Sequence, residues 1–392
     1  MKITFDNETI MTAMNKVEMT LENSMSLTLC PKDEAGNCLC CFSSATSSAQ
    51  VSTYTLYSAE PEVTEAQTFF FGKDFKDSVC ALISFNKDIV IEVDEKKVNL
   101  SSGPAKVTVN RLGTSATIPS VNPANEPDCV GFEIKTEAFL TALRKGGCAC
   151  ALKDVKSPYD DVVCLKPNTD DTILFLSTNG HVAASWSAKT EKRNENFSKF
   201  VENTGKVSIP GSLLGKVLSK IEADLCNVYL FSKQILIQSG MDFYQILSLA
   251  VDFPLEILAA LNKNEYSCKF TVDRASFTKA IEISILNGQT ESEQTISKLN
   301  IGNGKVIVSS VQDRNVLPLE ASVEGVLEIC ARASYLQRTC RVLGSKITIT
   351  GTTSVSPLFL TEEGGNGTIL VLPVNTSSAK TEEKPKPGKA EE

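Results

Sequence analysis

His181 is the only histidine in the 392-residue chain, so it is the first residue to test for acid–base chemistry. A catalytic role would need a partner, such as a serine or cysteine nucleophile in a recognisable motif. The sequence has no G-x-S-x-G, no H-E-x-x-H and no G-x-x-x-x-G-K-[ST]. Carboxylates are plentiful, but no pair is set apart by its surroundings. We therefore predict a protein that is not an enzyme and that needs no cofactor.

Cysteine is the other residue type that could do chemistry, with 13 copies. Two cysteines at positions i and i+2 point to one face of a strand, and no second pair follows at a zinc-finger spacing. We therefore expect small, reduced, buried side chains and no metal site. This applies to the densest groups, which are Cys30, Cys38, Cys40 and Cys41, and then Cys148 and Cys150.

Composition and charge restrict the class of protein further. The net charge is −8 and the pI is about 5.1, which excludes a nonspecific nucleic-acid coat but leaves room for one basic surface. No apolar run approaches the roughly 18 residues that a membrane-spanning helix needs. The first residues alternate in polarity and lack the apolar core of a signal peptide. The sequence predicts a cytoplasmic protein.

The elements that would position these residues form an internal repeat. Residues 3–14, 132–143 and 270–281 each change from strand periodicity to helix periodicity at the same place. Each copy has an apolar residue at the end of its strand, then a polar residue where the periodicity changes, and then an alanine within its helix. In chain order these are Phe5, Asp6 and Ala13; Ile134, Lys135 and Ala142; and Val272, Asp273 and Ala280.

A second strand–helix unit also occurs three times, at residues 69–79, 207–217 and 327–337. Short runs of β-forming residues, separated by polar turns, fill the rest of the chain. Each third of the sequence is thus predicted to hold two helices and several strands. The helices are expected at residues 6–20, 72–84, 135–147, 209–222, 273–285 and 331–344.

Polar, proline-containing stretches mark the predicted domain boundaries. We expect a first domain at residues 1–128, a second at 129–262 and a third at 263–375. Residues 376–392 contain almost nothing apolar, so they are predicted to form a disordered tail.

Several short motifs fall on this repeat in a fixed order. They are the start at residues 1–5, residues 177–182, the pair Phe253 and Pro254, residues 334–336, residues 354–356 and residues 371–374. In this order and spacing the chain resembles the bacterial DNA polymerase III β subunit, the sliding clamp, and it is identified as a divergent member of that family. The similarity covers residues 1–375.

The resemblance implies an α+β fold of three repeated clamp domains, each with two helices packed on β-sheets. It implies a ring, formed by a head-to-tail homodimer, that encircles duplex DNA without reading its sequence. Such a processivity factor tethers the replicative polymerase, the clamp loader and repair proteins. Ile285 and Leu286 lie where these clamps form the contact between subunits.

The charge distribution agrees with helices that line a DNA-filled hole. The six predicted helices carry a combined charge of +4, which leaves −12 for the rest of the chain. The helices of the first domain mix both signs and are expected to contribute little. The predicted DNA-facing residues, which would contact phosphates only, are Arg144, Lys145, Lys216, Lys220, Arg338 and Arg341.

The resemblance also implies an apolar cleft between the second and third domains that captures short peptides of partner proteins. One wall would contain Thr178, Gly180, His181, Val182 and Pro254, and the other Tyr335, Val355, Leu372, Pro373 and Val374. Many members of the family carry a basic residue where this chain has Val182. The cleft is therefore expected to be more apolar and less positive than usual.

A different class of function remains open from the sequence. The weakly charged first domain and the altered cleft would also suit a repeat-built, β-rich scaffold that binds proteins without encircling DNA. Retention on circular DNA, with loss from linear DNA, would distinguish the clamp from the scaffold.

Overall fold

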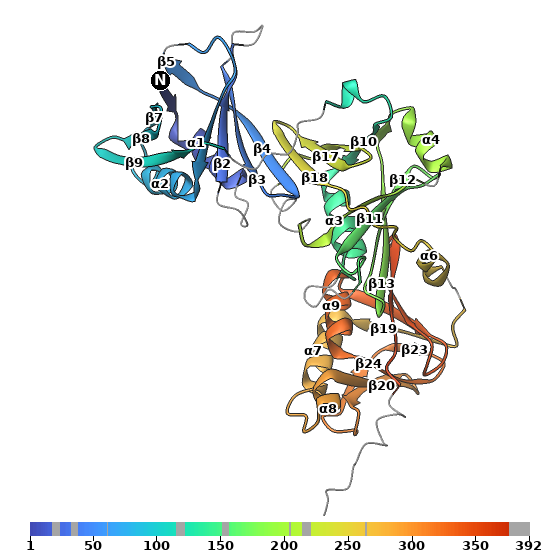
Figure 1. Ribbon diagram of the computed structural model, residues 1–392. Coiled ribbons are helices and arrows are strands. Elements are labelled where there is room, and N and C mark those ends of the chain that lie inside the picture. The colour runs from blue at the N-terminus through green and yellow to red at the C-terminus, as the bar shows by residue number, and fades with distance from the viewer. Residues whose placement is uncertain are drawn as a thin grey trace, which may run out of the picture. The chain divides into compact units, whose positions relative to one another are not determined.

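The computed structural model describes residues 1–17, 24–32, 38–60, 62–114, 122–150, 157–203, 205–213, 221–262 and 265–375, without the side chains of residues 292 and 293. The predicted tail therefore lies outside the described residues. Contacts group the chain into two compact units, whose helices and strands are labelled in Figure 1. The first unit holds Met1–Leu140, Leu165–Ile173 and Lys189–Ala250, and the second holds Thr141–Cys164, Leu174–Ala188 and Val251–Glu392.

The first unit is built on one 14-stranded sheet, in which neighbouring strands such as β1 and β7, β18 and β4, and β3 and β4 are antiparallel. In spatial order its strands are β14 (Lys192–Arg193), β10 (Val130–Lys135), β16 (Leu225–Leu230), β17 (Gln234–Ser239), β18 (Asp242–Leu247), β4 (Ala49–Leu56), β3 (Leu39–Ala45), β2 (Ser24–Leu29), β6 (Gln67–Gly72), β9 (Ala105–Leu112), β8 (Lys97–Ser102), β7 (Ile89–Val93), β1 (Lys2–Phe5) and β5 (Ser58–Glu60). The pairing of β18 with β4 joins the second predicted repeat to the first in one sheet.

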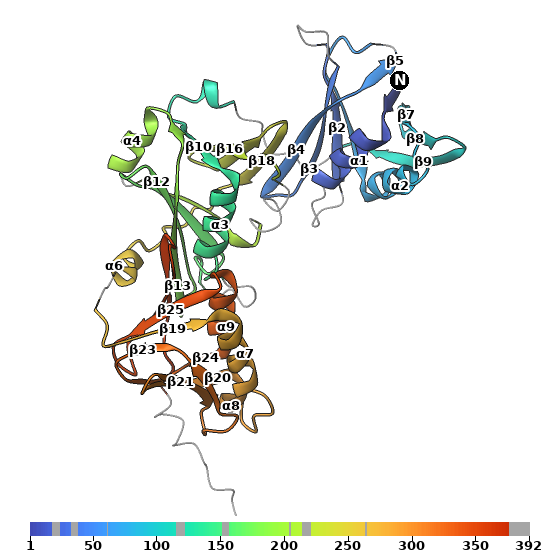
Figure 2. The ribbon, with the colours of Figure 1, turned by 180° about the vertical axis from the view of Figure 1, so that it is seen from behind.

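Helices α1 (Asn7–Lys16) and α2 (Lys73–Ile83) pack together against this sheet (Figure 2). Their buried faces repeat every three to four residues, as in Ile10, Ala13 and Met14, and this spacing places apolar side chains on one side of a helix. Phe75 of α2 stacks on Phe71 of β6 with ring centroids 4.0 Å apart. The same unit contains α4 (Asn196–Glu202), β15 (Val207–Pro210) and the 3₁₀ turn η1 (Pro123–Asn125).

The second unit contains two groups of strands. Part of a larger sheet runs in the order β13 (Val182–Lys189), β27 (Gly367–Val371), β26 (Leu358–Glu362), β25 (Lys346–Gly351), β19 (Cys268–Asp273) and β23 (Ser322–Glu324). A four-stranded sheet has the order β22 (Leu317–Glu320), β21 (Lys305–Ser310), β20 (Ile296–Gly302) and β24 (Leu327–Arg332). The division between the units falls within β11 (Val162–Pro167) and β12 (Thr172–Thr178).

Helices α7 (Arg274–Ser284) and α9 (Ala333–Val342) lie side by side in the second unit (Figures 1 and 2). Two short helices, α6 (Ile257–Leu261) and α8 (Glu291–Thr295), belong to the same unit. Helix α3 (Thr136–Gly146) begins in the first unit and runs mostly in the second.

The predicted strand–helix units are confirmed where the structure describes them. They are β1–α1, β10–α3, β19–α7, β6–α2 and β24–α9. Helical residues 211–213 follow β15, and the remainder of the helix expected at residues 209–222 lies largely outside the described residues. The α+β architecture is thus confirmed, whereas the division into three domains stays a prediction.

The cysteines singled out in the sequence do not gather into a metal site. Cys40, Cys41, Cys148 and Cys150 are buried, as expected, whereas Cys30 and Cys38 are only half-buried. Burial raises the pKa of Cys148 to about 12. Within the described ranges, no group of three or more His, Cys, Asp or Glu side chains could hold a metal ion. In the same part of the chain, no helix has the length and apolar character needed to cross a membrane.

Asp6 stabilises the start of α1, because its Oδ1 accepts a hydrogen bond from the Thr9 backbone N–H at 2.8 Å. The hydrogen bonds that Thr9 donates lower the pKa of Asp6 below its usual value. Asp6→Ala should therefore cost about 0.5–1 kcal/mol of unfolding free energy at pH 7. A lowered pKa adds stability above the unfolded-state pKa and loses it as the pH falls, so the difference should shrink below about pH 4.

Urea unfolding followed by circular dichroism at pH 7 and at pH 3 would measure this difference. Asp128→Ala, at an exposed aspartate outside the α-helices, serves as the control and should change little at either pH. An equal loss for Asp6→Ala at both values would contradict the capping role.

Candidate functional site

A hairpin between β12 and β13, held by side-chain hydrogen bonds, presents His181. The Asn179 side-chain oxygen accepts hydrogen bonds from the backbone N–H groups of His181 and Val182, at 3.0 and 2.8 Å. Thr178 Oγ1 donates to the Val182 carbonyl at 2.9 Å and accepts from the Gly180 N–H at 3.2 Å. Gly180 has a φ of +77°, a conformation that glycine adopts without strain. These bonds hold the turn, and His181 stands exposed at its tip.

Strand β27, near the end of the described chain, lies beside this hairpin. It pairs with β13 so that Val371 lies opposite Val182. The Leu372 backbone N–H then donates to the His181 carbonyl at 2.8 Å. Two segments nearly 200 residues apart in sequence are thereby fixed beside each other.

The next two residues attach the same segment to β24. Pro373 lies opposite Ala331 in an isolated bridge, and the Val374 backbone N–H donates to the Cys330 carbonyl at 2.8 Å. The segment of residues 372–374 therefore runs from the β12–β13 hairpin to the strand that leads into α9.

Tyr335, in the first turn of α9, completes this arrangement. Its ring stacks on the imidazole of His181, with centroids 5.7 Å apart and an angle of 21° between the ring planes. An aromatic pair of this kind forms a flat, largely apolar surface with polar edges, which suits contact with an extended peptide.

An apolar cluster lies next to the 372–374 segment. Its buried members are Ala183, Leu261, Phe359 and Leu370, and its half-buried members are Ile257, Ala260 and Leu372. Helix α6 supplies three of these residues, and half-buried Pro254 precedes it, with its carbonyl accepting from the Ile257 N–H at 3.4 Å. The sequence analysis missed Ile257 and Ala260, although the apolar run that follows Phe253 and Pro254 was a signal.

Val355 lies in the loop between β25 and β26 and is 68% exposed. Because Leu358 pairs with Val371, and Val371 pairs with Val182, this loop and the β12–β13 hairpin share one end of the sheet. Val182 itself is only 3% exposed, so its side chain fills the interior and offers no surface to a partner.

The structure therefore gathers five of the ten predicted cleft residues at one place, because Tyr335 and Leu372 contact His181 and the segment of residues 372–374 continues to β24. The five are His181, Tyr335, Leu372, Pro373 and Val374. Thr178 and Gly180 shape the hairpin, and Pro254 and Val355 lie on neighbouring segments. Among the ten predicted residues only His181 and Tyr335 carry titratable side chains, so the surface is mainly apolar.

The predicted DNA-facing residues divide into different environments. Arg144 on α3 and Arg341 on α9 are exposed, and the Arg341 guanidinium lies 3.6 Å from the Glu282 carboxylate. Arg338 is half-buried, and its guanidinium donates to the Cys150 carbonyl. Lys216 and Lys220 lie outside the described residues.

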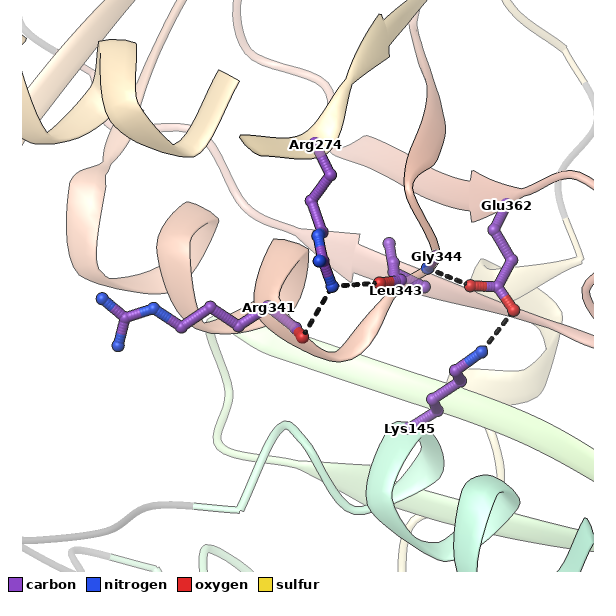
Figure 3. A network of polar contacts seen from close by, with 6 residues as sticks. All are labelled: Lys145, Arg274, Arg341, Leu343, Gly344 and Glu362. Atoms are coloured by element: carbon purple, nitrogen blue, oxygen red, sulfur yellow. Dashed lines mark hydrogen bonds and ion pairs between the residues drawn. The ribbon is translucent and has the colours of Figure 1, made fainter. Parts of the chain in front are cut away.

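Lys145 requires a correction, because it is buried and already paired. It is 8% exposed, its Nζ forms an ion pair with Glu362, and it lies 4.6 Å from the centroid of the Trp186 ring (Figure 3). A charge held in this way is not presented to solvent. The prediction that Lys145 faces DNA is therefore wrong in this structure.

Arg274 is a residue that the sequence analysis did not single out. Its guanidinium donates to the carbonyls of Leu343 at 2.9 Å and Arg341 at 3.4 Å (Figure 3). It thus satisfies backbone acceptors where α9 ends, and such acceptors have no partner within the helix. This contact holds α7 and α9 together at one end.

Ile285 and Leu286 follow the last turn of α7. Leu286 is 53% exposed, and Ile285 is half-buried. The Asn315 side chain donates to the Leu286 carbonyl at 2.7 Å, which ties the loop bearing Val316 to the end of α7. Val316 is also 53% exposed, so the apolar surface near α7 is larger than the sequence indicated.

No family model matches the sequence, and no curated protein matches it. Solved structures do match, over 96% of this chain: a DNA polymerase sliding clamp from Bacillus subtilis, the DNA polymerase III subunit beta from Pseudomonas aeruginosa, and the beta subunit of DNA polymerase from Streptococcus pyogenes. Sequence identities are 18%, 17% and 15%, TM-scores are 0.77, 0.77 and 0.76, and the matches cover 99%, 100% and 100% of those chains.

The chain therefore has an α+β fold of the clamp class, built by repetition. More narrowly, its fold is that of the bacterial DNA polymerase III β subunits, the sliding clamps. The resemblance read from the sequence is confirmed at the level of the fold.

Proposed function

We propose that this chain is a DNA sliding clamp that encircles duplex DNA and tethers replication and repair proteins to it. The observation that carries the proposal is the match to sliding clamps over 96% of this chain and nearly all of theirs, at a TM-score of 0.77. Because the match spans the whole fold, it supports a role that depends on the whole fold. Such a role is topological and needs neither catalysis nor a cofactor.

The internal repeat supports closure by a second copy. The last strand of the second repeat, β18, pairs with β4 of the first, and the last strand of the third repeat, β27, pairs with β13 of the second. By the same rule, the part of β9 that precedes Arg111 and Leu112, the two residues that pair with β6, would pair with β22 of another copy. Strand β22 is the edge strand of its sheet. Two copies, each of three domains, then close a ring by head-to-tail contacts.

The proposed DNA contacts come from arginine side chains on α3 and α9 and from two lysines that lie outside the described residues. Arg144, Arg338 and Arg341, with Lys216 and Lys220, would contact phosphates through side chains that carry no sequence preference. Lys145 is removed from this set because of its buried ion pair. Weak, mobile phosphate contacts suit a protein that slides.

The proposed partner site is the surface formed by His181, Tyr335 and residues 372–374, called here the cleft. It would take a short extended peptide with apolar anchors, because its walls combine an aromatic pair with aliphatic side chains and backbone groups. A sliding clamp from Pseudomonas aeruginosa has been solved bound to griselimycin, and we propose that this cleft also accepts that ligand.

The encirclement proposal can be tested without a clamp loader, by letting the chain thread over the open ends of linear duplex DNA. The ends are then blocked by a bulky protein or left open, and the salt concentration is raised to remove electrostatic binding. A clamp should remain on blocked DNA and be lost from open DNA. Equal retention on both would contradict encirclement, and no retention on either would favour a scaffold that binds proteins only.

A further inference from the structure

Two lysines at the same position of the repeat make partly buried ion pairs. Counting three residues beyond the shared alanines, Ala13 and Ala142, leads to Lys16 and Lys145. Lys16 lies at the end of α1 and Lys145 near the end of α3. The two lysines belong to different units, so each arrangement stands on its own contacts.

Lys16 reaches from the first repeat to the second. Its Nζ lies 2.8 Å from an Asp242 carboxylate oxygen; the Asp242 side chain is 5% exposed and the Lys16 side chain 22% exposed. The other oxygen of Asp242 accepts from Thr53 Oγ1 at 2.6 Å. Asp242 begins β18 and lies opposite Thr53 of β4, so the ion pair lies where the two repeats share their sheet.

Lys145 reaches from the second repeat to the third in the same manner. Glu362 ends β26, and one of its oxygens pairs with Lys145 while the other accepts from the Gly344 N–H (Figure 3). The side chains of Lys145 and Glu362 are 10% and 12% exposed. The Lys145 ammonium also lies over the ring of Trp186. Trp186 of β13 pairs with Gly367 of β27, at the end of these two strands that is farther from His181.

The third repeat differs at this position. Counting from Ala280 leads to Ile283, which is half-buried and carries no charge. The lysine is thus present in the two repeats that are followed by another repeat in the chain, and absent from the last one. A lysine that served only solubility or DNA contact would not be expected to depend on whether another repeat follows in the chain.

We infer that the ion pairs of Lys16 and Lys145 hold neighbouring repeats together, because each joins the first helix of one repeat to a hairpin of the next. Their removal opens the nearby strand pairing without unfolding the repeats. A buried carboxylate that loses its cationic partner is strongly destabilised, and the least costly relief is local opening that admits water. The inference concerns a single chain and goes beyond the proposed function.

Hydrogen–deuterium exchange of the full chain tests the two ion pairs separately. Lys145→Met should speed amide exchange in β13 and β27 on the order of 100-fold while leaving β4 and β18 unchanged. Lys16→Met should do the reverse. Lys298→Met is the matched control, because Lys298 pairs with Asp313 and Glu328 inside one repeat and should affect neither pair of strands.

A second readout is the emission of Trp186, the only tryptophan in the chain. Lys145→Met and Glu362→Gln should each make it more accessible to acrylamide, whereas Lys16→Met and Lys298→Met should not. Exchange that rises evenly across both units, or that stays unchanged in the paired strands, would overturn the inference.

Discussion

Leu286→Asp should leave the chain folded but convert the proposed two-copy ring into monomers. Leu286 is 53% exposed at the end of α7, so in a single chain the aspartate can remain hydrated. In a ring the same position would be covered by the second copy, and a buried, unpaired carboxylate would cost free energy. Removal of a central interface residue typically costs about 2–4 kcal/mol, which weakens the dimer roughly 30- to 1,000-fold.

Light scattering behind a sizing column measures this effect directly. The unaltered chain should have about twice its own mass of 42.4 kDa, and the variant should have the single-chain mass at micromolar concentration. The variant should also be lost from end-blocked linear DNA. Val326→Asp is the matched control, because Val326 is 75% exposed and lies in the turn before β24. A variant that stays dimeric would place the subunit contact elsewhere.

The local part of this fold could be predicted from the sequence. The change from strand to helix at Asp6 and Asp273 depends on residues within one turn, since each aspartate accepts a hydrogen bond from the backbone three residues later. Apolar spacing then fixes which helix face is buried. The strand–helix units and the α+β class follow from such short-range signals.

Lys145 shows why the site could be predicted only in part. Its spacing on α3 relative to Phe139 and Ala142 suggested an outward-facing charge. The partner that buries it, Glu362, is 217 residues away in sequence. Similarly, Val182 is covered because β13 pairs with β27, a strand from the end of the described chain. Pairings between such distant segments leave no local signal in either segment.

Tyr335→Ala should weaken binding of griselimycin to the cleft about tenfold or more. The Tyr335 ring stacks on His181 and borders the segment of residues 372–374, so its removal takes away an anchor surface and leaves His181 unsupported. Truncation of a central aromatic residue typically costs more than 1 kcal/mol, and often 2 or more. Isothermal titration of the full chain with griselimycin measures the change.

The structure offers a control that separates the cleft from general effects of removing a tyrosine. Tyr266 is 47% exposed, belongs to the same unit and lies outside the segments that form the cleft. Tyr266→Ala should therefore keep the affinity of the unaltered chain. Equal losses in both variants, or no binding by the unaltered chain, would contradict the proposed cleft. Because the proposed subunit contact involves Leu286 and not Tyr335, we expect Tyr335→Ala still to form the proposed two-copy ring, which separates partner binding from encirclement.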